Sequence, residues 1–146
     1  MRFTTLLRSI AGRPALRTPP RPGRQELGRL GENAAARLLR RARYRVLARN
    51  VRTRSGEADL VCLAPDRSTL VIVEVKTRLL VGEHPPPEAS VDAHKRLKLR
   101  QVRRALIRAN RWQDRPVRID VVAVDWPDEP RARPSLRHYI AAVEPD

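Results

Sequence analysis

Apolar and polar positions alternate with two different periods along the chain, and the two periods predict helices and strands. The segment from Gly28 to Ala42 places apolar side chains on one stripe at helical spacing. A second helix is predicted from Ser90, as its N-cap, to about Arg111. The core-facing positions of these helices are Leu30, Ala34, Leu38 and Ala42 in the first and Leu99, Val102, Leu106 and Ala109 in the second.

Five segments alternate or run apolar as strands do. They are predicted at Arg43 to Arg52, Gly56 to Ala64, Val71 to Thr77, Val117 to Val124 and Leu136 to Val143. Together with the helices they give the order αβββαββ, which is typical of a single α/β domain with a mixed central sheet flanked by helices. The helix between the third and fourth strands allows a crossover connection.

The strand Val71 to Thr77 begins apolar on both faces and then carries two opposite charges. Glu74 and Lys76 point the same way because side chains alternate across a strand. A strand that is apolar on both faces is typically central and buried. Charges at its end cost free energy unless they are paired, hydrated or bound to something. A divalent cation or a phosphate would meet that need, and so would a salt bridge between the two residues.

A second carboxylate is predicted to lie beside Glu74. The turn Pro65 to Ser68 joins two strands into a hairpin, which would bring Asp59 near Glu74 across the ladder. Two carboxylates with a nearby lysine suit a hydrolytic Mg²⁺ or Mn²⁺ site. Lys76 could orient the attacking water or stabilise the oxyanion. The alternatives remain that Asp59 binds a turn N–H, and that Glu57 is either a further ligand or a solvated edge residue.

The ordered series of motifs resembles a known family. Asp59 followed by Glu74-Val75-Lys76 looks like the D…ExK signature of the PD-(D/E)xK nuclease superfamily. The wider pattern, from about Gly28 to about Val143, resembles the YraN-like family. It comprises Gly31-Glu32 with Ala35, Arg49-Asn50, Gly56 to Val61, Val73 to Arg78, Ser90-Val91, Lys95, Lys98-Leu99 and Arg118 to Val122. The segment Tyr139 to Val143 departs from that pattern because it lacks an expected phenylalanine.

The resemblance implies a restriction-endonuclease-like fold close to archaeal Holliday-junction resolvases. It implies a metal-dependent endonuclease acting on DNA, including branched or structured DNA, and a homodimer as in related resolvases. The implied metal ligands are Asp59 and Glu74, with Lys76 as a catalytic residue and Glu32 as a first-helix carboxylate joining the site. For Glu32, stabilisation by the positive end of the helix dipole is an alternative that suffices by itself.

Charge agrees with a nucleic-acid partner. The 146 residues carry a net charge of +15, and the first 25 residues supply six arginines and no acid, which leaves +9 on the remainder. Such charge attracts polyanions, although a GC-rich genome also inflates arginine. Aromatic residues make up only 3%, so backbone recognition is expected rather than base stacking. The candidate phosphate contacts are Arg52, Arg78, Lys95 and Lys98, for which a solvated surface is the alternative.

Other chemistry is disfavoured. The single cysteine, Cys62, excludes an internal disulfide and sits among apolar residues, as a core residue does. The three histidines lack metal-ligand spacing with it, which disfavours a histidine-based zinc hydrolase. Asp120 matches the family pattern, and we expect it to form an internal salt bridge.

Residues 1–27 form the other predicted region, a disordered basic tail rich in proline and arginine. A flexible arm that adds electrostatic affinity is the simpler interpretation, and a transit peptide is the alternative. No stretch approaches the length of a membrane-spanning helix, so we expect a cytoplasmic protein without a membrane partner. Two rival functions remain open: a non-catalytic nucleic-acid-binding module with the same fold, and a scaffold that docks an acidic partner.

Overall fold

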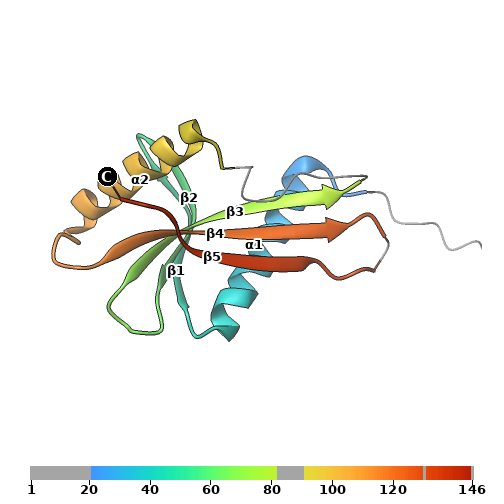
Figure 1. Ribbon diagram of the computed structural model, residues 1–146, viewed down its shortest axis with the longest axis horizontal. Coiled ribbons are helices and arrows are strands. Elements are labelled where there is room, and N and C mark those ends of the chain that lie inside the picture. Colours follow the sequence, from blue (N-terminus) through green and yellow to red (C-terminus); the bar gives the residue numbers. More distant parts are fainter. Residues whose placement is uncertain (1–20, 82–90, 130, 146) are drawn as a thin grey trace, which may run out of the picture.

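The computed structural model describes residues 21–81, 91–129 and 131–145, and the sequence 1–20, which holds most of the predicted tail, lies outside them. The elements follow the predicted order αβββαββ (Figure 1). They are α1 (Arg24–Arg41), β1 (Arg45–Thr53), β2 (Gly56–Leu63), β3 (Leu70–Leu80), α2 (Ala93–Asn110), β4 (Val117–Pro127) and β5 (Ser135–Val143). The predicted single α/β domain is confirmed, and it is consistent with a restriction-endonuclease-like fold.

Element boundaries differ from the predictions at several ends. Helix α1 begins at Arg24, four residues earlier than predicted, and β3 and β4 each extend three residues further. The predicted N-cap Ser90 lies outside the described residues. Asp92 is the N-cap instead, and its Oδ1 accepts a hydrogen bond of 2.8 Å from the Lys95 N–H. Side-chain capping satisfies a backbone donor that the first helical turn leaves free.

The five strands form one sheet in the order β1-β2-β3-β4-β5. Strands β3 and β4 are parallel, and the other three neighbouring pairs are antiparallel. Because α2 joins the two parallel strands, it is the predicted crossover helix.

The two helices cover opposite faces of the sheet. Val71 and Val73 pack in a cluster with the apolar side of α1, whereas Leu70 and Ile72 pack with α2. Alternate residues of a strand point to opposite faces, so β3 is buried on both sides, as its apolar run predicted. Glu74, in step with Leu70 and Ile72, therefore lies on the α2 face.

The sheet divides between β2 and β3, and we call this place the fork. Pairing of the two strands covers only Leu60–Leu63 with Leu70–Val73. Beyond it β2 continues with β1 as far as Gly56, while β3 continues with β4 as far as Leu80. The next residues after the last pair are Asp59 and Glu74, so the predicted juxtaposition falls at the point where the strands separate.

Helix α1 lies very close to β3 just beyond the fork. A Cβ added to Gly31 would meet the Cβ of Thr77 at 2.8 Å, closer than such atoms can approach. Only glycine permits this contact, which explains why a buried glycine occupies the middle of a helix despite its cost there. The contact fixes the neighbouring Glu32 beside the fork.

A second acidic residue, Asp120, lies fully inside the protein. Its carboxylate is bound by the Arg118 Nε at 2.9 Å, by the His138 Nε2 at 2.8 Å and by the Ala141 N–H at 2.9 Å. Arg118 also donates to the Tyr44 hydroxyl at 2.8 Å. We call these residues the Asp120 cluster. The predicted internal salt bridge of Asp120 is confirmed.

Two further expectations concern burial and membranes. Cys62 is a fully buried core residue, as expected, and burial raises the pKa of its thiol to about 12. Among the described residues, neither helix is both long enough and apolar enough to cross a bilayer.

Candidate metal centre at the fork of the sheet

Asp59 and Glu74 are brought together at the fork. Asp59 Oδ2 accepts a hydrogen bond of 2.7 Å from the Val75 N–H. This side chain takes the place that a backbone carbonyl of β2 would occupy if the ladder continued, so the carboxylate itself helps to end the pairing. Glu74 is only 6% exposed. We call Asp59 and Glu74 the fork pair.

The surroundings of the fork pair disfavour the ionised form of Asp59. Burial, and then the neighbouring Glu74, raise the pKa of Asp59 to about 6. The Val75 N–H and Lys95 act in the opposite direction and do not offset the increase. Two carboxylates held side by side away from water repel each other, and a bound cation would relieve the repulsion.

Glu32 faces the fork from α1. Burial and the charge of Asp59 raise its pKa, while a hydrogen bond with the Asn50 side chain and the charge of Arg49 lower it. Asn50 adopts a left-handed conformation with φ of 50°, and the β1–β2 pairing passes over it. From this left-handed position in β1, the Asn50 side chain lies within hydrogen-bonding reach of Glu32. Arg49 makes a parallel link, donating to the Asn33 Oδ1 at 2.9 Å.

Glu57 and Lys76 lie on either side of the fork pair. The charge of Glu57 raises the pKa values of both Asp59 and Glu32, so Glu57 adds to the negative field of the site. It is also 3.6 Å from the Arg52 guanidinium. Lys76 is half-buried on the same face as Glu74, and within the described chain its ammonium group forms no ion pair.

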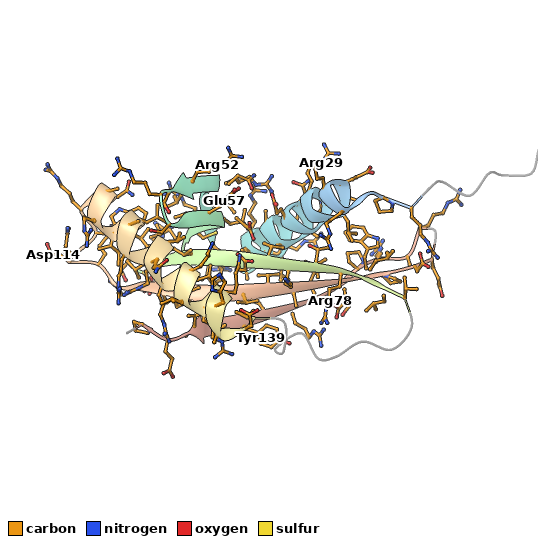
Figure 2. All side chains as sticks on the ribbon, turned by 90° about the horizontal axis from the view of Figure 1, so that it is seen from above. Arg29, Arg52, Glu57, Arg78, Asp114 and Tyr139 are labelled. Carbon is orange, nitrogen blue, oxygen red and sulfur yellow. The ribbon has the colours of Figure 1, made fainter. Side chains whose placement is uncertain are left out.

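The four predicted phosphate contacts fall into different surroundings. Lys95 binds Glu74, with Nζ 2.8 Å from Oε1, so its nearest anion is the candidate metal ligand itself. Arg78 lies 3.4 Å from Asp125, a carboxylate that also binds Arg137, and only 17% of its side chain is exposed. Arg52 and Lys98 are exposed. Figure 2 shows Arg52 and Glu57 on the same side of the molecule as Arg29, and Arg78 on the other.

The donor set fits a hard cation such as Mg²⁺ or Mn²⁺. Across the residues that the structure describes, no three His, Cys, Asp or Glu side chains are arranged to enclose a metal. Mg²⁺ does not need such a cage, because it keeps several waters and binds one or two carboxylates together with substrate phosphates. The fork pair supplies two neighbouring carboxylates, and carboxylate oxygens are the ligands that this ion prefers.

Comparison with known sequences identifies the family. The chain matches the uncharacterised protein family UPF0102 over residues 31–124. The chain belongs to this family, which corresponds to the YraN family. It is 40% identical over 130 residues to a UPF0102 protein of Anaeromyxobacter dehalogenans, covering 85% of this chain and 88% of the relative. A UPF0102 protein of Geobacter sulfurreducens is 41% identical over 120 residues, covering 81% and 88%.

A third relative shows the same likeness. A UPF0102 protein of Clavibacter michiganensis is 45% identical over 103 residues, covering 70% of this chain and 85% of the relative. The family match contains the fork pair, Glu32 and Lys76, and it ends before β5. The resemblance drawn from the motifs is therefore confirmed at the level of the family.

Sequence reasoning missed three features of the site. The roles of Asn50, Gly31 and the ion pair between Lys95 and Glu74 were not predicted. An asparagine inside a strand is unusual, and it could have signalled the left-handed residue in β1. A glycine inside a helical stripe could have signalled the close approach of α1. No local signal identifies the Lys95 pair, because its partners come from separate elements.

Proposed function

We propose that this protein is a metal-dependent nuclease that hydrolyses phosphodiester bonds in nucleic acid, with DNA as the expected substrate. The observation that carries the proposal is the fork pair, two adjacent carboxylates of which one has its pKa raised to about 6. Strong perturbation of a partly buried acid by a specific charged partner is typical of functional sites. A half-buried lysine two residues beyond Glu74 completes the set.

Each residue of the site would have a separate role in hydrolysis. Hydrolysis joins a water oxygen to phosphorus and breaks the bond to one sugar oxygen. Asp59 and Glu74 would hold Mg²⁺ or Mn²⁺, which lowers the pKa of a bound water and neutralises phosphate charge. Lys76 would orient the attacking water or oppose the charge that develops on the phosphoryl oxygens. Glu32, held by Asn50, would accept a hydrogen bond from water at the edge of the site.

A cleavage assay tests this proposal. Purified protein is incubated with labelled duplex, single-stranded and four-way-junction DNA in Mn²⁺, Mg²⁺ or chelator. We expect cleavage that requires the metal, and a loss of at least about a hundredfold in Glu74→Gln, comparable to removing a key charged group from an active site. Asp114→Asn is the matched control, because Asp114 is an exposed carboxylate far from α1 (Figure 2).

The variant Lys76→Ala separates catalysis from binding. We expect it to abolish cleavage while leaving the affinity for DNA nearly unchanged, since many other cations contribute to binding. If affinity fell instead, Lys76 would be a contact residue and its catalytic role would be wrong. Salt-sensitive binding without cleavage in any metal would overturn the nuclease proposal and favour the non-catalytic binding module.

A further inference from the structure

A groove of about 760 Å³ lies between α2 and the end of β1. Its floor is formed by small and aliphatic residues of α2, namely Ala105, Leu106 and Ala109. Its rim carries three arginines, Arg52 and Arg54 from the hairpin side and Arg108 from the helix. The three side chains are exposed, and none of the described residues that line the groove is acidic or aromatic.

The groove is held in shape by the β1–β2 turn. Gly56 has a φ of 143°, and a Cβ added there would lie 3.2 Å from Val102 of α2. Thr53 Oγ1 donates to the Gly56 carbonyl at 2.9 Å and accepts from the Ser55 N–H at 3.1 Å. A turn locked by its own hydrogen bonds and seated on the helix keeps the two walls apart before any ligand binds, which lowers the entropy cost of binding.

The charge of the groove selects an anionic occupant. Arginine presents a planar fork of donors that matches phosphate oxygens, and three of them on opposite walls could contact successive phosphates. The absence of aromatic side chains among the lining residues leaves no platform for base stacking. The chemistry therefore suits a sugar–phosphate backbone that is read without regard to base sequence.

The groove also leads towards the fork. Arg52 on its rim lies 3.6 Å from Glu57, and the charge of Glu57 in turn acts on Asp59. Glu57 and Asp59 are only two residues apart on β2, so the ion pair of Arg52 with Glu57 places the arginine rim close to the candidate metal ligands along this strand. A nucleic-acid strand lying in the groove would approach the fork pair at its end.

We propose that the groove between α2 and the β1–β2 hairpin binds the phosphate backbone of nucleic acid and guides it to the fork pair, with Arg54 and Arg108 as contact residues. The inference rests on the proposed function for its choice of partner. It adds two residues that the sequence did not indicate, and it distinguishes them from basic residues elsewhere on the surface.

The test compares two double variants of equal charge. Arg54→Gln with Arg108→Gln removes two rim cations, whereas Arg43→Gln with Arg67→Gln removes two from a separate pocket that also holds three arginines, with Arg45 as the third. That control pocket lies at the other end of β1, roughly 25 Å away at about 3.3 Å per residue. Binding of a fluorescein-labelled DNA duplex to the full chain is measured by anisotropy over a range of salt concentrations, with chelator present.

We expect the groove variant to weaken binding by about tenfold per lost contact near 0.1 M salt, and to reduce the slope of log affinity against log salt by about one per contact. The control variant should change the slope by less than about half of that. Equal losses in both variants would overturn the proposal, because affinity would then come from diffuse charge. Circular dichroism and melting of each variant verify that it is folded.

Two further outcomes separate this inference from the nuclease proposal. Because chelator is present, binding is measured whether or not the protein cleaves DNA, and failure of the groove variant to weaken binding leaves metal-dependent cleavage standing. Unlabelled polyglutamate at matched charge should displace the duplex poorly. Equally effective displacement by polyglutamate would overturn the assignment to nucleic acid and indicate an acidic protein partner.

Discussion

Asp59 and Asp120 are both acidic residues inside a largely apolar sheet, but their surroundings act on them in opposite directions. Burial acts to raise the pKa of Asp120, yet its hydrogen bonds with His138, Arg118 and the Ala141 N–H outweigh burial and hold the pKa below its ordinary value. Asp59 has one backbone donor and another carboxylate beside it, and its pKa rises to about 6. One carboxylate is surrounded by donors, and the other is short of positive charge.

The difference separates a structural acid from a candidate functional one. Buried charges persist at little net cost when their partners are complete, and the Asp120 cluster meets that condition within the protein itself. The fork pair meets it only in part, because Lys95 engages Glu74 while Asp59 receives a single backbone N–H. A metal ion bound by the fork pair would supply the missing positive charge.

The largest expected effect is on stability when the two acids are removed in turn. Asp120→Ala removes the only carboxylate that the Asp120 cluster offers to Arg118, His138 and the Ala141 N–H, and should lower the free energy of unfolding by about 3–5 kcal/mol. Asp59→Asn keeps an acceptor for the Val75 N–H and removes the repulsion with Glu74, so at pH 7 it should change stability by less than about 1 kcal/mol or increase it. Urea denaturation measures both, and equal losses would erase the proposed distinction.

The close contact between Gly31 of α1 and Thr77 of β3 provides the next test. Gly31→Ala should cost about 1–3 kcal/mol or more, because the new methyl group would collide with Thr77 and push α1, with Glu32, away from the fork. Gly28→Ala is the matched control in the same helix, where an added Cβ meets no atom within 4 Å, and it should stabilise by up to about 1 kcal/mol. Thermal melting measures the stability of both variants, and similar melting temperatures would contradict the close contact between α1 and β3.

The dependence of stability on pH should differ in sign between the two acids. A raised folded-state pKa means that the native protein holds the proton of Asp59 more tightly than the unfolded chain does. Its contribution to stability is therefore present below about pH 4 and is lost as pH rises to about 6, by about 2–3 kcal/mol. Asp120, with a lowered pKa, contributes stability above about pH 4 that is lost on acidification.

The variant Asp59→Asn isolates that contribution. Urea denaturation of wild type and variant between pH 4 and pH 7 should show the variant gaining relative stability as pH rises. A difference between the two proteins that stays constant across this range would mean that Asp59 titrates normally.

The smallest expected effect comes from Lys95. Its positive charge lowers the pKa of Asp59, so Lys95→Met should raise that pKa further and move the decline in stability to higher pH. Lys98→Met, one turn along the same helix and exposed, is the control and should leave the profile unchanged. Identical pH profiles of stability for the two variants would show that the charge of Lys95 does not affect the pKa of Asp59.

Sequence patterns predicted the order of the elements, the crossover through α2 and the closeness of Asp59 to Glu74, because each depends on local periodicity or on a short hairpin. The fork itself was not predictable. The pairing of β2 with β3 ends where the Asp59 carboxylate accepts a hydrogen bond from the backbone N–H of Val75, and hydrophobic periodicity does not encode this bond. The ion pair of Lys95 with Glu74 and the complete Asp120 cluster could not be predicted from the sequence either, because their members come together only through the tertiary fold.

Carboxyl-carbon NMR titration of the two acids, with and without Mg²⁺, measures directly whether Asp59 binds a metal ion and Asp120 does not. Asp59 and Asp120 are assigned by their Asn variants, and both pKa values are followed in one experiment. We expect a pKa of about 6 for Asp59 that falls when Mg²⁺ is added, and a pKa for Asp120 below its ordinary value that does not respond. An ordinary pKa for Asp59 together with no response to Mg²⁺ would contradict this expectation.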